Sequence, residues 1–224
     1  HKTVLLDLRD SVFALAETGM MGFNWHPDYP DSPYIYVAMV YGTERPEYRV
    51  VNRYRVQTDT TGKDTLIEPF EIFREAPSNY SHQGCRIRVG VDRMLWVTTG
   101  DNFVDDGLHA QDTTSNLGKV LRMHLDGSVP DDNPVAGQLM WTYGHRNVQG
   151  LAILPDGTIY SSEHGASIED EVNLLRKGAN YGWPFVEGPC DEEYEGEFCS
   201  EVHPEPPAFS SGPTNTYAMC GLEY

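Results

Sequence analysis

The sequence predicts an all-β fold built from a repeated unit, because turn residues are frequent, long helical patterns are missing and one hairpin segment recurs. Among 224 residues there are 21 glycines and 15 prolines, and aromatic residues make up 11%. This composition is typical of many short strands joined by turns. The apolar spacing of an amphipathic helix predicts only one short helix, near residues 5–16.

The hairpin segment occurs three times along the chain. Each copy has an apolar strand, a turn that contains aspartate, and a second strand rich in β-branched or aromatic residues. The copies are residues 22–40, 86–101 and 150–165. Their turn aspartates, Asp28, Asp92 and Asp156, follow one another at intervals of 64 residues. The equal interval indicates an internal repeat.

Further strands are expected between the hairpins, at residues 48–56 and 118–125, with a short strand or turn within 170–184. Groups of about four strands at this interval suggest a β-propeller. At this interval the chain holds about 3.5 blades, whereas a ring closes with about four or more. We therefore expect one partial propeller domain over residues 1–224 and no second domain, with a further segment or another chain supplying the remaining blades.

The charge balance narrows the class of partner. The chain has 34 acidic and 16 basic residues, a formal net charge of −18. Nucleic acid is disfavoured because phosphate binding needs clustered lysine and arginine. The acidic balance fits an extracellular or cation-binding protein, although simple solubility explains it equally well. No apolar run long enough for a membrane span occurs, and the opening residues HKTVLLDLRD predict no signal peptide, so we expect a chain that begins after processing or partway through a larger protein.

The cysteines point to an oxidising compartment. Cys190 and Cys199 bracket the acidic stretch CDEEYEGEFC, whose spacing disfavours zinc and predicts a local disulfide. Cys85 and Cys220 form a second bridge or stay free. Asn79 begins NYS, a short match to the glycosylation acceptor pattern. We therefore expect a secreted, extracellular or periplasmic protein.

Five motifs occur in the order found in the glucose/sorbosone dehydrogenases, and the chain resembles this family. They are GMMGFNWHPDY, SHQGCRIRVGVDRMLWVTTGD, NLGKVLRMHLDGSVPDDNP, YGHRNVQGLAILPDGTIYSSEHG and DEVNLLRKGANYGWP. The resemblance implies a quinoprotein that uses pyrroloquinoline quinone (PQQ) and Ca2+ on a six-bladed β-propeller. The chain matches roughly the middle three to four blades, and the family's cofactor-clamping lysine and arginines are expected after Tyr224.

Oxidation of a sugar hydroxyl needs a base for the proton, an acceptor for the hydride and a cation for the developing charge. His82, in the polar loop NYSHQG, is the candidate base, and Asp101 returns near it at the end of the next hairpin to fix its tautomer. The resemblance gives both residues these roles and adds Arg146 as the catalytic cation at the quinone. Glu17, His82, Arg146 and Asn147 are then the expected cofactor contacts. The ordinary alternatives are loop and turn residues without a role.

The sequence EHGAS with the acidic EDE is the candidate calcium region, since calcium takes six to eight oxygens, many of them backbone carbonyls. The resemblance implies that the carbonyls of Gly165 and Ala166 bind the calcium that also contacts PQQ. It implies a second, structural calcium bound by the Glu171 side chain and the Tyr181 carbonyl. The alternative for IEDEV is a solvated acidic turn.

These observations predict a PQQ- and calcium-dependent oxidoreductase that converts an aldose-type sugar to its lactone. A catalytically inactive propeller that serves as a binding or structural module is the alternative, because a fold does not fix a function. A calcium-dependent propeller lactonase is a third reading, and the motifs match it less well.

Overall fold

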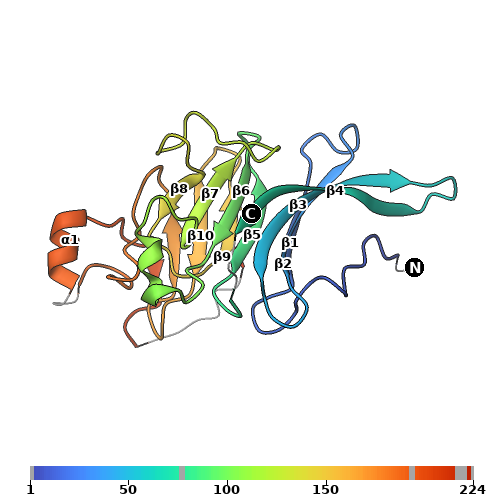
Figure 1. The fold of residues 1–224 in the computed structure, drawn as a ribbon. Helices are drawn as coiled ribbons and strands as arrows, with labels where there is room; N and C mark the ends of the chain where they lie inside the picture. The colour runs from blue at the N-terminus through green and yellow to red at the C-terminus, as the bar shows by residue number, and fades with distance from the viewer. Residues whose placement is uncertain (1–2, 76–78, 192–194, 215–220, 223–224) are drawn as a thin grey trace.

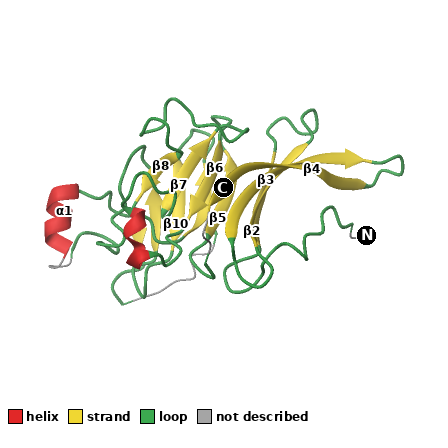
Figure 2. Ribbon diagram, viewed as in Figure 1, coloured by secondary structure: helices red, strands yellow, loops and turns green. Residues whose placement is uncertain are grey.

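Three four-stranded antiparallel sheets follow one another along the chain (Figures 1 and 2). The computed structural model describes residues 3–75, 79–191, 195–214 and 221–222. The first sheet contains β1 (Met20–Trp25), β2 (Tyr34–Tyr41), β3 (Tyr48–Thr58) and β4 (Asp64–Glu75). The second contains β5 (Gly84–Val89), β6 (Leu95–Thr99), β7 (Lys119–Met123) and β8 (Met140–Tyr143). The third contains β9 (Val148–Ile153), β10 (Ile159–Glu163), β11 (Glu171–Leu174) and β12 (Phe209–Ser210).

The recurring hairpin segments are the first two strands of each sheet. β1 pairs with β2, β5 with β6 and β9 with β10, each antiparallel, so all three predicted hairpins are confirmed. The turn aspartates Asp28, Asp92 and Asp156 lie in the three connecting turns. The predicted strands at 48–56 and 118–125 are confirmed as β3 and β7, and β11 is the short strand expected within 170–184.

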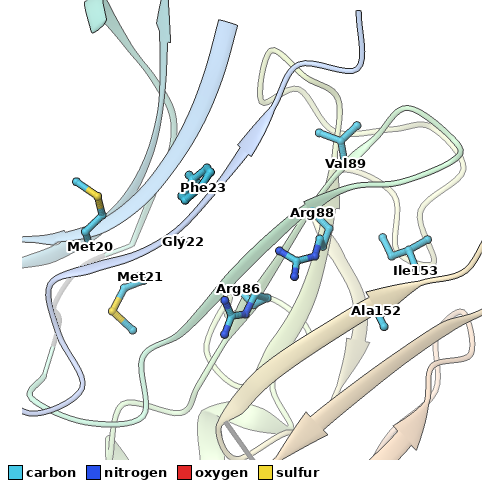
Figure 3. A pocket seen from close by; sticks show the side chains of 9 residues that line it. All are labelled: Met20, Met21, Gly22, Phe23, Arg86, Arg88, Val89, Ala152 and Ile153. Atoms are coloured by element: carbon cyan, nitrogen blue, oxygen red, sulfur yellow. The ribbon is translucent and has the colours of Figure 1, made fainter. Parts of the chain in front are cut away.

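The first strand of each sheet faces a common axis. β5 contacts both β1 and β9, an arrangement that places the three sheets as propeller-like blades. These strands line an open cavity whose wall includes Met20, Phe23, Arg86, Arg88 and Ile153 (Figure 3). The arginines come from alternate positions of β5 and therefore share one face of the strand.

Buried apolar side chains fill the space between neighbouring sheets. Between the first two sheets, Tyr36 and Ala38 of β2 pack with Ile87, Val97 and Leu121 of the second sheet. A second cluster joins Trp96 and Val120 to Val148, Leu151 and Ile159 of the third sheet. These two layers fix the sheets relative to one another, because burial of apolar surface is the main stabilising contribution to such contacts.

The segment before β1 contains turns and no helix, so the short helix predicted near residues 5–16 is wrong. Leu6, Leu8 and Val12 pack on the outer face of the first sheet against a cluster that includes Val37 and Met39. Leu6 and Leu8 are two residues apart, which is the period of an extended chain. Packing against the face of β2 that carries Val37 and Met39 therefore outweighs the weak helical pattern.

Two short helical elements lie outside the sheets, and one of them is held by a disulfide. They are the 3-10 element η1 (Asp105–Ala110) and α1 (Gly196–Val202), which lies at one end of the molecule (Figure 2). The predicted disulfide between Cys190 and Cys199 is confirmed, with an S–S distance of 2.06 Å. Cys85 is a buried free thiol, and Cys220 lies outside the described residues. No helix in the described part of the chain is long and apolar enough to cross a membrane.

Candidate active site

The predicted catalytic residues gather at one end of the sheets. Glu17 precedes β1, His82 precedes β5, and Arg146 with Asn147 precedes β9, so the loops that enter the three innermost strands bring them together. Asp101 follows β6, and an antiparallel partner strand ends where its neighbour begins. The topology therefore explains why residues separated by more than a hundred positions share one site.

His82 and Asp101 form a buried hydrogen-bonded pair. Nδ1 of His82 lies 2.6 Å from Oδ1 of Asp101. Because the carboxylate accepts this hydrogen bond, Nδ1 carries the proton and Nε2 presents its lone pair. Nε2 has no hydrogen-bond partner among the described residues. The arrangement is that of an oriented general base.

Two further donors hold the Asp101 carboxylate. The backbone N–H of Phe103 donates to Oδ1 at 3.0 Å, and Nε1 of Trp183 donates to Oδ2 at 2.7 Å. Burial acts to raise the pKa of Asp101, but the hydrogen bonds from His82 and Phe103 outweigh it and the pKa is lowered. The carboxylate is therefore ionised at neutral pH and orients His82 as an anion.

The ring of Phe103 covers one face of His82. The two ring centroids are 3.8 Å apart, and the ring planes are inclined by 24°. His82 is only 4% exposed, whereas Phe103 is 60% exposed. Phe103 thus forms an apolar wall over one face of the imidazole.

Arg146 lies next to this pair and is half-buried. Its guanidinium stands 5.3 Å from the centroid of the Trp183 ring, and Nη1 donates to the carbonyl of His164 at 3.3 Å. The buried Nε has no hydrogen-bond partner among the described residues. Burial lowers the pKa of Arg146, while Asp101 and nearby glutamates act to raise it. The guanidinium stays charged at any working pH and retains an unused donor.

Glu17 and Asn147 are directed toward the backbone of His82 and toward each other. Oε2 of Glu17 accepts from the His82 N–H at 2.9 Å, from Asn147 Nδ2 at 2.9 Å and from Gln149 Nε2 at 3.4 Å. Oδ1 of Asn147 accepts from the Gly84 N–H at 3.2 Å. The amide of Asn147 is 1% exposed. Polar side chains of the turn WTYGHRNVQG therefore join three loops through hydrogen bonds.

A second histidine–carboxylate pair lies in the third sheet. Nδ1 of His145 is 2.7 Å from Oε1 of Glu163, and Nε2 is 2.9 Å from Oγ1 of Thr142. The ring stacks on Tyr181 with centroids 4.6 Å apart. His145 has no exposed surface, so both ring nitrogens are engaged and buried.

The candidate calcium region lines a small cavity beside Arg146. Its wall includes Glu163, Gly165, Glu169, Glu171 and Tyr181. Gly165 donates its N–H to Asp170 at 3.0 Å, and Ala166 donates its own to Glu187 at 3.0 Å. Their carbonyl oxygens accept no hydrogen bond from the described residues. Within the described part of the chain, no three His, Cys, Asp or Glu side chains are grouped to hold a metal, so a site here depends on carbonyl oxygens.

The Glu171 carboxyl in this wall is buried, and its ionised form is electrostatically unfavourable. Both of its carboxylate oxygens accept hydrogen bonds, from the Gly188 N–H and from Asn173 Nδ2, each at 2.8 Å. Burial and the nearby charge of Glu163 raise the pKa of Glu171 to about 8. Two buried carboxylates in contact with one cavity favour a cation in it.

The structure brings together His82, Asp101 and Arg146, which the sequence predicted as base, carboxylate and cation. The sequence prediction did not include Trp183, Phe103 or Glu163. Trp183 connects Asp101 to Arg146 through its indole N–H and its ring face. The sequence signal for Trp183 is the motif ANYGWP, which supports the family resemblance but gives the tryptophan no role. Phe103 carried only the signal of an apolar residue in a polar turn.

Comparison with known proteins matches most of the chain to one family model. The family model described as Glucose / Sorbosone dehydrogenase matches residues 2–217. The chain belongs to the glucose/sorbosone dehydrogenase family. The resemblance seen in the five sequence motifs is therefore confirmed.

Relatives of this family share about a third of the sequence. The chain is 36% identical over 202 residues to quinoprotein glucose dehydrogenase B of Acinetobacter calcoaceticus, covering 79% of this chain and 42% of that protein. It is 31% identical over 183 residues to aldose sugar dehydrogenase YliI of Escherichia coli, covering 78% of this chain and 48% of that protein. The chain thus spans less than half the length of these relatives.

The fold is similar to that of a PQQ-bound aldose sugar dehydrogenase from Streptomyces coelicolor. The TM-score is 0.83 at 32% identity, and the match covers 100% of this chain and 62% of that chain. The all-β, propeller-like architecture predicted from the repeat is therefore confirmed.

Proposed function

We propose that the protein is a quinoprotein dehydrogenase that oxidises an aldose-type sugar to its lactone with PQQ and calcium. The observation that carries the proposal is the His82–Asp101 pair with an unpartnered Nε2 next to a half-buried guanidinium. The relatives described above are named dehydrogenases, which favours the enzyme over a binding module. The chain would contribute roughly three to four blades of a six-bladed propeller, as one domain over residues 1–224 that a further segment or chain completes.

The residues beside Arg146 fit an anionic planar cofactor. The unused, buried Nε of Arg146 is an orphaned donor that a cofactor oxygen would satisfy. The Trp183 ring under the guanidinium adds a flat surface of the kind on which planar groups stack. Arg146 and His82 would contact this side of PQQ, and Glu17 and Asn147, the other two predicted contacts, would hold the loops that carry them. When bound, the cofactor supplies a quinone that accepts a hydride.

The chain's own residues then handle the proton and the charge. Nε2 of His82 takes the proton from the hydroxyl at the hemiacetal carbon of the sugar, and Asp101 stabilises the imidazolium that results. Arg146 would offset the negative charge that the hydride brings to the acceptor. Phe103 covers one face of the imidazole, and Trp183 holds the second oxygen of the Asp101 carboxylate.

Calcium would occupy the carboxylate-lined region. The free carbonyl oxygens of Gly165 and Ala166 are suited to an ion beside the cofactor. The Glu171 carboxylate and the Tyr181 carbonyl would bind a second, structural ion. A divalent cation next to Glu171 offsets the like charge of Glu163, which otherwise raises the pKa of Glu171.

The disulfide supports an oxidising compartment. The Cys190–Cys199 bond closes a short loop, and such bonds persist in secreted and periplasmic proteins. We place the protein outside the cytoplasm on this ground.

The test is reconstitution of the protein with PQQ and calcium, followed by dye reduction across a panel of aldoses. We expect sugar-dependent reduction that needs both additions, is abolished by a chelator and is restored by calcium. The Arg146→Ala variant should lose activity, while Arg176→Ala, at an exposed pair with Glu205, should keep it. Absence of dye reduction with every aldose would overturn the proposal.

A further inference from the structure

The backbone of His82 is held in an unusual conformation. Its φ is 56°, in the left-handed region, and Gly84 and Cys85 follow with φ of 61° each. A residue with a Cβ adopts this region at a cost, so surrounding groups must hold it there. Gly100 packs directly on the carbonyl oxygen of His82, where a Cβ would collide with it. The direction of the imidazole therefore depends on what holds this peptide.

A carboxylate holds the amino side of His82. Oε2 of Glu17 accepts the His82 N–H at 2.9 Å. The same oxygen accepts the side-chain amides of Asn147 and Gln149, from the loop that enters the third sheet. Hydrogen bonds to an ionised acceptor are stronger than neutral ones. Glu17 thus ties His82 to the loop that carries Arg146.

A buried guanidinium holds the carbonyl side of His82. Arg49 comes from β3 of the first sheet and is 1% exposed. Its Nη1 lies 2.6 Å from the carbonyl oxygen of Gln83 and 3.5 Å from that of His82. Its Nε and Nη2 have no hydrogen-bond partner among the described residues.

Arg49 forms no hydrogen bond or ion pair within 4.0 Å with a carboxylate in the described part of the chain, although its cross-strand neighbour Glu75 lies near enough for the two charges to interact. A buried charge without a hydrogen-bonded carboxylate is costly. Its charge is therefore directed at the two carbonyls of the His82 loop. This placement is not needed for the sheet, whose β3–β4 ladder is made by backbone groups.

We propose that Glu17 and Arg49 are positioning residues that clamp the left-handed His82 peptide from opposite ends. The acceptor charge sits at the N–H and the donor charge at the carbonyls, so the two charges complement the peptide dipole. The clamp fixes the direction in which Nε2 presents its lone pair. This inference rests on the proposed role of His82 as the base, and Arg49 separates positioning from binding because a side chain 1% exposed cannot contact a sugar.

The first test measures the clamp without cofactor or sugar. Amide hydrogen exchange is compared for wild type, Arg49→Met, Arg49→Lys and Glu17→Gln. The matched controls are Arg55→Met, an arginine on the same strand that pairs with exposed Glu68, and Glu44→Gln at an exposed turn. We expect exchange at the His82 amide and in residues 79–85 to rise about tenfold or more in Arg49→Met and Glu17→Gln, with the third sheet unchanged.

The second test is kinetic. In Arg49→Met we expect kcat to fall about 10²-fold with KM within about threefold, because a small misplacement of a base affects the reaction more than ground-state binding. Arg49→Lys, which keeps the charge, should recover part of kcat. A general loss of stability would not be rescued in this way.

The hydrogen-exchange test and the kinetic test together separate the clamp from the proposed function. If no sugar is oxidised but exchange at His82 rises as expected, the function fails and the clamp stands. Should Arg49→Met not fold, Arg49→Lys and Glu17→Gln provide the same comparison. Exchange at the His82 amide within twofold of wild type in both of these variants would overturn the clamp, as would a loss confined to KM in Arg49→Lys.

Discussion

Two histidine–carboxylate pairs lie at equivalent places in neighbouring sheets. They differ in whether Nε2 of the histidine has a hydrogen-bond partner. His82 bonds Asp101 at 2.6 Å and His145 bonds Glu163 at 2.7 Å, each through Nδ1. Each imidazole also stacks on an aromatic ring. Thr142 engages Nε2 of His145 inside the protein, whereas Nε2 of His82 has no partner in the described part of the chain.

The comparison shows that a histidine–carboxylate pair is not in itself a base. The carboxylate orients the ring in both pairs, but only an unengaged Nε2 can take a proton from a substrate. In the second sheet the aromatic partner is exposed Phe103, and in the third it is buried Tyr181. Under the proposed function one repeat would use the pair for chemistry, whereas the other holds Arg146 in place, because Glu163 also accepts the Arg146 N–H at 3.0 Å.

Replacement of His82 should produce the largest effect on activity. We expect His82→Ala to lower kcat/KM of the reconstituted protein by about 10²–10⁴-fold, the range supplied by a positioned general base. The melting temperature should fall as well, because the buried Asp101 loses one hydrogen-bond donor, although the Phe103 N–H and Trp183 Nε1 still hold its carboxylate. Steady-state dye reduction and thermal unfolding measure the two quantities. Activity within tenfold of wild type would remove His82 from the role of base.

Replacement of His145 should instead appear in stability. His145→Ala leaves the buried Glu163 without its ionic partner, which costs about 3–5 kcal/mol in the free energy of unfolding. Urea unfolding followed by circular dichroism measures this loss. His164→Ala serves as the control, since His164 is partly exposed and lies 3.6 Å from Asp170. A loss below about 1 kcal/mol in His145→Ala would show that the two pairs do not differ as described.

The hydroxyl that distinguishes the two pairs gives a sharper test. Thr142→Val keeps the volume of the side chain and removes the partner of His145 Nε2. An unsatisfied buried polar group costs about 1–3 kcal/mol, so we expect a loss of that size in the free energy of unfolding. Thr58→Val, at an exposed position of β3, should stay within about 0.5 kcal/mol of wild type. Equal effects in the two variants would mean that Thr142 does not set the difference.

The sequence predicted those parts of the molecule that follow from local pattern. The hairpins and their 64-residue interval were visible because strand alternation and turn chemistry are local. The meeting of His82 with Asp101 was predictable because a hairpin returns the chain to its start. The course of the segment before β1 was not predictable, because its apolar residues find their partners on the face of β2.

The contacts that reach the site from other parts of the fold could not be predicted from local pattern. Trp183 reaches Asp101 from a turn after β11, and Arg49 reaches the carbonyls of the His82 loop from β3 of the first sheet. Their side chains meet the site only after the sheets pack. The same reasoning applies to Thr142, whose hydroxyl becomes important only when His145 is buried beside it.

The smallest expected effect is the acid dependence of stability in the two pairs. Hydrogen bonds and the neighbouring imidazole overcome burial and lower the pKa of both Asp101 and Glu163. A carboxyl with a lowered folded-state pKa adds stability above its unfolded pKa, about 4 for these groups, and loses it as pH falls through the folded value. The free energy of unfolding of wild type should therefore fall below about pH 4.

Asp101→Asn and Glu163→Gln should each flatten this acid slope, because the substituted amide does not titrate. The measurement is urea unfolding at a series of pH values from 7 downward, with Asp31→Asn as a control at an exposed turn. An unchanged slope in Asp101→Asn would mean that the carboxyl is already protonated beside His82. In that case it could not orient the imidazole as an anion, and the distinction between the two pairs would no longer lie in Nε2 alone.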